Sequence, residues 1–203
     1  MGICRDVACN VPTYIFAPSF HPKGGLILYS KALHYGEKFV YFTDLNLNIM
    51  KQDTDLRIIE LGLILPPAPK PIGAYKPVVV VDKFLFVSGQ VPLKADGTMI
   101  KGRLGADLDV NAGKLAARQV GLTMLSTIKA HFGELNKIKR IVKVLGMVNS
   151  SPDFESHPAV INGFSELMAE VFGDDNGVGV RSAVGMFLPT NIAVEIEAMF
   201  ELK

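Results

Sequence analysis

Hydrophobic and polar positions alternate near the end of the chain, where apolar residues over 194–198 are separated by Glu195 and Glu197. A period of two predicts a β-strand that carries both carboxylates on one face. Arg181 opens a second apolar stretch, which ends at a turn over 188–191. The pattern therefore predicts a terminal hairpin in which an arginine lies opposite a carboxylate, an arrangement suited to an anionic substrate and a built-in base.

Short apolar runs predict three more strands upstream. Residues 78–81 and 84–87 flank Asp82-Lys83, and two apolar runs around such a pair are typical of a β-hairpin. The segment 137–149 is also predicted to be a strand, because it is rich in Ile and Val and follows a helix-ending glycine.

A short amphipathic helix is predicted over 53–63, with Asp53 or Thr54 as its cap. Its expected core face consists of Leu56, Ile59 and Leu63. The stretch 65–71 that follows is rich in proline, which lacks a backbone donor and fixes φ. We therefore expect an extended strap between this helix and the first hairpin.

Two longer helices are predicted in the second half of the chain. One begins at Asp109 or Asn111 and runs to about Phe132, ahead of a glycine. Its expected core positions are Leu115, Leu122, Leu125 and Ile128. The other covers about 156–172, with a proline in its first turn.

The resulting order of elements, β-β-α-β-α-β-β, predicts an α+β fold. One mixed β-sheet would carry two helices packed on one face. The face of the sheet opposite the helices must also be covered. The alternating apolar residues of the strands indicate that a partner subunit, rather than water, lies against it.

The first part of the chain differs from the rest, which predicts an N-terminal extension over 1–49 and a regular domain over 50–203. Prolines and a Gly24-Gly25 pair interrupt the extension. Its apolar residues follow neither the helical nor the strand period for long. Short strands are expected at 26–29 and 39–43. The role of the extension is open, and mitochondrial or other targeting by it stays an alternative.

Composition narrows the class of protein. Hydrophobic residues make up 49% and charged residues 20% of 203, which is ordinary for a globular protein. The net charge of +1 gives no reason to expect nucleic acid or a membrane surface as a partner, and no apolar run approaches the length of a bilayer span. Cys4 and Cys9 are expected to be free thiols, so a reducing, cytoplasmic location is predicted.

The sequence lacks the motifs of several classes of enzyme. Gly113-Lys114 is missing the other residues of a phosphate-binding loop, and Ser88 is not embedded in Gly-x-Ser-x-Gly. Four scattered histidines do not form a metal site, so we expect no metal. Arg181 and the carboxylates survive as candidates, although Glu195 and Glu197 also fit a plain solvated strand face.

Basic residues along 137–149 leave a second interpretation open. Lys137, Lys139 and Lys143 fall on one predicted strand face, as in an RNA-binding groove. A solvated face explains the same pattern and agrees better with the near-neutral chain.

From residue 71 onward the sequence resembles the YjgF/Rid family of reactive-intermediate deaminases, also labelled L-PSP endoribonucleases. The similar pieces occur in family order: 72–75, 86–92, 148–154, Asn162, Arg181-Ser182, Leu188-Pro189 and 195–198. The resemblance covers about two-thirds of the chain. It implies a chorismate-mutase-like fold and a homotrimer with clefts between subunits.

The same resemblance assigns roles to individual residues. Arg181 would hold a substrate carboxylate through a bidentate pair, which its planar guanidinium suits. Glu195 would position or activate a water molecule. The remaining cleft residues would be Tyr75, Ser88, Asn162 and the backbone at Ala183.

The implied reaction is hydrolysis of a 2-imino or enamine acid to a 2-keto acid and ammonia, without metal or organic cofactor. Two other classes stay open. One is an endoribonuclease or translation inhibitor, and the other is a non-catalytic, carboxylate-binding or chaperone-like trimer.

Three departures from the family pattern suggest a divergent branch. Ala183 stands where better-known members often carry cysteine, so a thiol is absent there. The segment from Arg181 to the 188–189 turn is one residue shorter. Extra residues over 155–158 precede Asn162 and are expected to reshape the rim of the cleft.

Overall fold

A computed structural model describes residues 14–18, 29–35, 38–42 and 53–203, and the chain divides into two compact units, 1–52 and 53–203. In the first unit, three strands form an antiparallel sheet in the order β1-β2-β3: β1 (Tyr14–Pro18), β2 (Tyr29–Tyr35) and β3 (Lys38–Phe42). The strand expected at 39–43 largely coincides with β3. Most of the strand expected at 26–29 lies outside the described residues.

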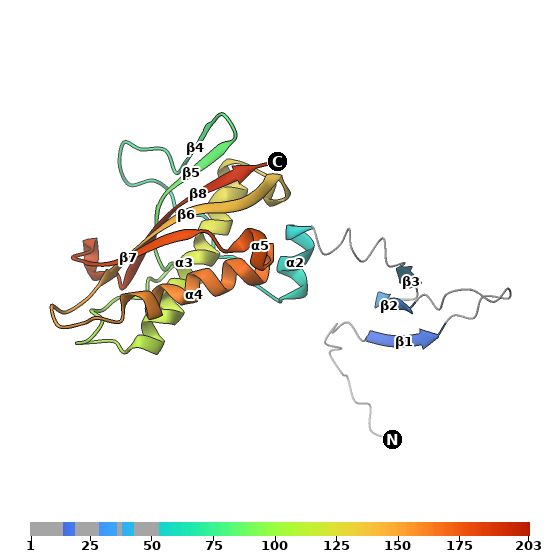
Figure 1. Ribbon diagram of the computed structural model, residues 1–203, viewed down its shortest axis with the longest axis horizontal. Coiled ribbons are helices and arrows are strands. Elements are labelled where there is room, and N and C mark those ends of the chain that lie inside the picture. The colour runs from blue at the N-terminus through green and yellow to red at the C-terminus, as the bar shows by residue number, and fades with distance from the viewer. Residues whose placement is uncertain (1–13, 19–28, 36–37, 43–52) are drawn as a thin grey trace, which may run out of the picture. The chain divides into compact units, whose positions relative to one another are not determined.

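The second unit is built on a five-stranded sheet in the order β4-β5-β8-β6-β7. Its strands are β4 (Val78–Val81), β5 (Phe84–Gln90), β6 (Ile138–Asn149), β7 (Val180–Met186) and β8 (Val194–Leu202). β6 and β7 are parallel, whereas the other neighbours are antiparallel. The helices α3 and α4 pack against one face of this sheet (Figure 1). The predicted α+β fold with a mixed sheet and two helices on one face is confirmed.

The predicted terminal hairpin is wrong, because β7 and β8 are not neighbours. β6 lies between them, with β7 on one edge and β8 on the other. The chain leaves β6, crosses over through α4 and returns as β7 parallel to β6, so β7 has to occupy the free edge of β6. The turn η2 (Pro189–Asn191), with φ of 53° at Thr190 and 59° at Asn191, then carries the chain to the other side of β6.

Four α-helices lie within 53–203: α2 (Thr54–Glu60), α3 (Val110–His131), α4 (His157–Phe172) and the short α5 (Asp174–Gly177). The Asp53 side chain accepts hydrogen bonds from two backbone amides of the first turn of α2, and Asp109 does so from Ala112 in α3. The first backbone N–H groups of a helix have no acceptor within the helix, and these two side chains accept hydrogen bonds from them. This stabilises the start of each helix at that point of the chain.

Three predicted core positions are wrong. Ile58 is the buried apolar residue of α2, whereas Leu56 and Ile59 are 36% and 73% exposed. In α3, Leu115 is 66% exposed, although Leu125 and Ile128 are buried as predicted. α3 packs against both the sheet and α4, so its buried face centres on small residues such as Ala116 and Ala117 rather than on the leucine stripe.

The hydrophobic core lies between the helices and the sheet. Alternate residues of β8 point into it, as the period of two predicts: Val194, Ile196, Ala198 and Phe200. The other face of the sheet carries exposed apolar side chains, including Phe86 at 43% exposure and Val79. We call this second surface the open face. No helix within the described ranges is long and apolar enough to cross a membrane.

Candidate functional site

Glu195 lies on the open face, opposite Met147 of β6 in the strand register. Its carboxylate packs over the backbone of β5, where a methyl group added to Gly89 would overlap the Glu195 side chain. The absence of a side chain at position 89 therefore makes room for this carboxylate. The alternation that predicted Glu195 and Glu197 on one strand face is confirmed, because both lie on the open face.

The surroundings of Glu195 disfavour its charged form. The side chain is half-buried and makes no hydrogen bond or ion pair with any of the described residues. Burial raises the pKa of Glu195 above its ordinary value, and the charge of Glu197 two residues along the same face raises it further. A carboxylate with a raised pKa is a better proton acceptor than an ordinary surface glutamate.

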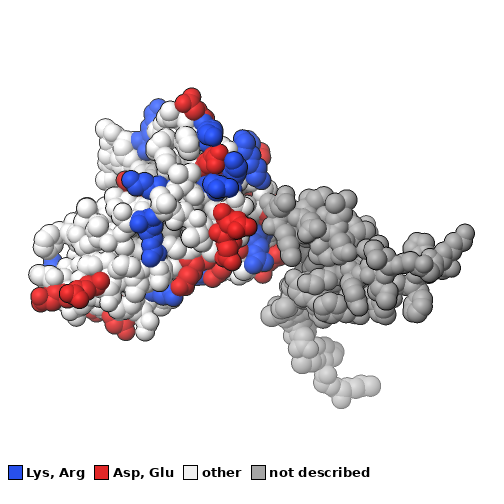
Figure 2. Space-filling model, viewed as in Figure 1, with Lys and Arg blue, Asp and Glu red and all other residues white. Residues whose placement is uncertain are grey.

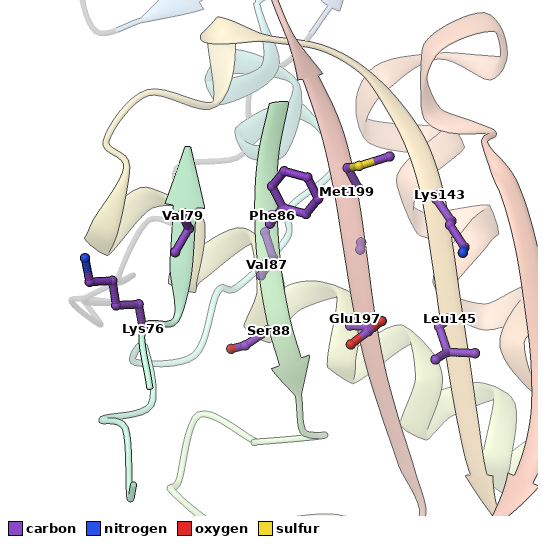
Figure 3. Close-up of a pocket in the computed structure, with 10 residues that line it drawn as sticks. Lys76, Val79, Phe86, Val87, Ser88, Lys143, Leu145, Glu197 and Met199 are labelled. Carbon is purple, nitrogen blue, oxygen red and sulfur yellow. The ribbon is translucent and has the colours of Figure 1, made fainter. Parts of the chain in front are cut away.

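A cavity of about 490 Å³ opens on the same face. It spans four strands, and Figure 3 shows Phe86 and Ser88 from β5, Glu197 and Met199 from β8, and Lys143 from β6 around it. Its lining combines apolar side chains with two lysines, one carboxylate and one hydroxyl. Such a cavity suits a small ligand with both an apolar part and a polar group.

Arg181 lies on the opposite face of the sheet, where it reaches α4. Its Nη1 donates to Ser165 Oγ at 2.9 Å, and its Nη2 donates to Asn162 Oδ1 at 2.9 Å and to the Pro158 carbonyl at 3.2 Å. All three acceptors are neutral, and no carboxylate in 53–203 pairs with this guanidinium. Three of its five N–H donors thus bind neutral acceptors, and no acidic side chain in 53–203 neutralises its charge.

The structure brings some predicted site residues together and leaves others apart. Arg181 and Asn162 are in direct contact, and Ala183 follows on the same face of β7, partly buried. Ser88 and Glu195 share the open face instead. Arg181 and Glu195 therefore lie on opposite faces of the sheet within one chain, with β6 between their strands.

Tyr75 lies on the strap that precedes β4 and is 52% exposed. The strap is tied to β5 by a hydrogen bond from the Ser88 amide to the Pro77 carbonyl at 3.0 Å. Among the described residues, no hydrogen bond links the Tyr75 side chain to the other site candidates. Its ring instead lies near Gly73, at the solvent-facing end of the strap.

Comparison with known families identifies the domain. A family model described as "YjgF/chorismate mutase-like, putative endoribonuclease" matches residues 55–195. This chain belongs to that family. The residues matched include Arg181 and Glu195 and exclude the first unit of the chain.

Individual relatives of this YjgF-family chain agree with that assignment. It is 43% identical over 143 residues to Protein TCP17 of Trypanosoma cruzi, covering 70% of this chain and 89% of the relative. It is 30% identical over 133 residues to a RutC family protein of Pyrococcus horikoshii, covering 65% of this chain and 90% of the relative.

Solved structures show the same fold. A protein of unknown function from Agrobacterium tumefaciens is 37% identical with a TM-score of 0.68, covering 79% of this chain and 100% of its own. A structure described as "a putative endoribonuclease" from Shewanella oneidensis is 32% identical with a TM-score of 0.70. The match covers 74% of this chain and 99% of that chain.

No group of three or more His, Cys, Asp or Glu side chains within the described part of this YjgF domain could hold a metal ion. The polar groups around the candidate site are single carboxylates, hydroxyls and amides on separate strands and helices. The candidate site thus contains an arginine with no carboxylate partner in 53–203 and a half-buried carboxylate with a raised pKa.

Sequence reasoning missed the residues that fix Arg181. Ser165 and the Pro158 carbonyl contribute two of its three acceptors. They lie on α4, and only the packing of α4 against the β7 edge brings them within reach. The spacing of Asn162 and Ser165, three residues apart on one helix face, is the only sequence signal that could have indicated them.

Proposed function

We propose that this protein is a hydrolytic deaminase of 2-imino acids, which it converts to 2-keto acids and ammonia. The observation that carries the proposal is the state of Glu195, a half-buried carboxylate with a raised pKa and no donor among the described residues. A carboxylate held in this way accepts a proton from water. Families of one fold host different chemistries, so the proposal rests on the site rather than on the family name.

In the proposed reaction, Glu195 takes a proton from a water molecule while the water oxygen bonds to the imine carbon. Glu195 passes that proton to the nitrogen, so that the carbon carries one hydroxyl and one amino group. The hydroxyl proton then moves to the amino nitrogen as the carbon–nitrogen bond breaks, and ammonia leaves as the keto group forms. Glu195 is ionised again at the end of the cycle. Neither oxidation nor a carrier group is required, because the imine carbon is already electrophilic.

Arg181 is proposed to bind the carboxylate of the imino acid. Its guanidinium is pre-positioned by the three neutral acceptors on α4 and has no acidic partner within 53–203. Charge-assisted, bidentate hydrogen bonds to a carboxylate favour arginine over lysine. The two groups together select a small molecule that has an anion next to its electrophilic carbon.

The separation of Arg181 and Glu195 supports a site shared between subunits. The open face exposes Phe86, Val79 and the partly exposed Met199, which are costly to leave in water. We infer that the open face is covered by further copies of this chain in a homotrimer. The arginine of one copy would then complete the site that contains the glutamate of the next.

An imine assay tests the proposal. An amino-acid oxidase with catalase generates a 2-imino acid, and semicarbazide traps the imine that is still present. The protein is expected to lower semicarbazone formation and raise free ammonia. Arg181→Ala and Glu195→Gln should each lower kcat/KM by about 10²-fold or more, the size expected for a lost general base or orienting group.

Arg118→Ala is a matched control, because Arg118 is paired with Glu170 on the outer surface of the helices. This variant should keep full activity. Absence of turnover with several imino acids, together with keto-acid binding in calorimetry, would instead identify a non-catalytic carboxylate-binding protein.

Endoribonuclease activity is the second candidate, favoured by the description of the family and by Lys143 in the open-face cavity. Its expected basic face is partly neutralised, since Lys139 lies against Glu201 and Lys137 against Glu134. On the face in Figure 2, Lys and Arg are interspersed with Asp and Glu. Cleavage of labelled RNA that is lost in Lys143→Ala would support this candidate over the deaminase.

A further inference from the structure

A second group of reactive side chains lies at the carboxyl ends of the two parallel strands. Ser150 directly follows β6, and His157 is the first residue of α4. β6, α4 and β7 form a βαβ unit, and ligands of such units bind outside the carboxyl ends of the strands. Arg181, by contrast, lies near the amino end of β7. This second group therefore uses other side chains than the proposed deaminase site, although the two groups meet at the first turn of α4, where Pro158 follows His157 and accepts a hydrogen bond from Arg181.

The Ser150 hydroxyl and the His157 imidazole are in hydrogen-bond contact, with 2.9 Å between Oγ and Nε2. In the tautomer that carries its proton on Nδ1, the imidazole accepts the hydroxyl proton through Nε2. Phe154 packs against the imidazole with ring centroids 5.2 Å apart and planes at 89°, which fixes the orientation of the ring. A serine and a histidine in this geometry form a nucleophile–base pair.

The pair faces a cavity of about 310 Å³, which is large enough for a small acyl compound. Its lining includes Ser150, Ser151, Phe154, His157, Gly185 and Phe187. Gly185 keeps it open, because a methyl group at that position would lie 2.7 Å from His157 Nε2 and 2.8 Å from Ser150 Oγ. Any larger residue at 185 would separate the serine from its base.

A cation without a carboxylate partner lies next to this cavity. The Arg103 guanidinium carbon is 5.3 Å from the centre of the Phe187 ring. Arg103 Nε is buried without a hydrogen-bond partner, and no ion pair within 53–203 involves this side chain. A buried donor without an acceptor carries a free-energy cost that an anionic ligand would remove.

We propose that Ser150 is a nucleophile activated by His157, in a site for activated esters of small acids that carry a negative charge. His157 Nε2 takes the Ser150 proton as Oγ bonds to the carbonyl carbon. The alcohol or phenol leaves with that proton, and the acyl group stays on Ser150. Water then attacks the acyl group in the same way, which releases the acid and restores Ser150.

The first test is covalent labelling of the full chain with an alkyl fluorophosphonate. Ser150 Oγ would bond to phosphorus, fluoride would leave, and the serine proton would pass to His157. Intact-mass and peptide analysis should show one adduct, on Ser150. Ser150→Ala should remove the adduct, and the matched control Ser151→Ala should retain it.

Two variants test the role of the base without removing the nucleophile. His157→Asn should slow labelling by about 10²-fold, the usual contribution of a general base. Gly185→Ala should also slow it, because the added methyl displaces the pair. Both should keep the circular dichroism spectrum of the parent protein. Labelling at the parent rate in both variants would overturn the nucleophile–base pair.

The charge preference is tested with two aryl esters of similar size, p-nitrophenyl hemisuccinate and p-nitrophenyl butyrate. The hemisuccinate should be hydrolysed faster, and Arg103→Gln should abolish the difference. Equal rates in the parent protein would overturn the anionic substrate class. Failure of the parent protein to react with the fluorophosphonate would overturn the proposal as a whole, whatever the variants do.

Discussion

Arg181 and Glu195 project from opposite faces of one β-sheet, with β6 between the strands that carry them. Arg181 pairs with Val144 in the register and reaches α4, whereas Glu195 pairs with Met147 and lies over Gly89 on the open face. Residues on opposite faces of a sheet cannot touch the same small molecule inside one chain. A site that uses both residues therefore requires two copies of the chain.

Mixed assemblies test that requirement. When Arg181→Ala and Glu195→Gln chains are unfolded together and refolded as a mixture, about a quarter of the interfaces should combine an intact arginine with an intact glutamate. Imine hydrolysis should recover to about that fraction of the parent rate, while each variant alone stays inactive. A mixture as inactive as its components would place both residues in one subunit's site.

The open face should be an assembly surface. Phe86→Asp introduces a charge beside the open-face cavity and is expected to convert the oligomer to monomers, because a buried unpaired charge is strongly destabilising. Light scattering coupled to size-exclusion chromatography measures the mass. Leu115→Asp, at a more exposed apolar position on the outer side of α3, is the control that should keep the parent mass.

Glu197 should influence the pH at which kcat/KM begins to rise. Burial raises the pKa of Glu195 first, and the Glu197 charge adds to it. Glu197→Gln removes the second cause, so the pKa of Glu195 falls and the rise of kcat/KM with pH should move to lower pH. A pH profile that does not move would show that Glu195 is not the base, or that Glu197 does not interact with it.

Glu195→Gln should raise thermal stability at neutral pH. A carboxyl whose pKa is raised in the folded state favours folding when protonated and loses that contribution as pH rises through the folded-state pKa. The variant cannot ionise, so its melting temperature should exceed the parent value by a few degrees at pH 7. At pH values below the unfolded pKa of glutamate, the difference should disappear in differential scanning fluorimetry.

The contact between α3 and α4 should tolerate no side chain at Gly163. A methyl group there would overlap the Lys114 carbonyl of α3 and force the helices apart. Gly163→Ala is expected to cost about 2–3 kcal/mol in urea unfolding, despite the better helix propensity of alanine. Gly121→Ala meets the flexible ends of Leu167 and Met168 instead, so it should cost less than about 1 kcal/mol.

Local patterns predicted most elements of the second unit. The caps at Asp53 and Asp109 act within a few residues of themselves, so the sequence narrowed each helix start to two candidate residues, of which the structure selects one. The period of two in β8 likewise fixes which residues share a face. Leu115 shows the limit of this reasoning, because a helix that packs on two sides buries a different face from the one its leucines mark.

Strand order and the two candidate sites depended on tertiary structure. Adjacent strands in sequence often pair, which favoured a hairpin of β7 with β8, but the α4 crossover makes β7 parallel to β6. That topology sets Arg181 against Ser165 and leaves Glu195 on the other face. The same crossover brings Ser150 to His157 across a loop, a contact that no sequence spacing signals.

The sequence by itself determined the family and most helices and strands of 53–203, and it indicated the two residues of the proposed deaminase chemistry, because these follow from local periodicity and short motifs. Tertiary structure decided which residues meet. Contacts between distant segments depend on strand order and helix packing, and these are set by burial of the whole core rather than by any one stretch of chain.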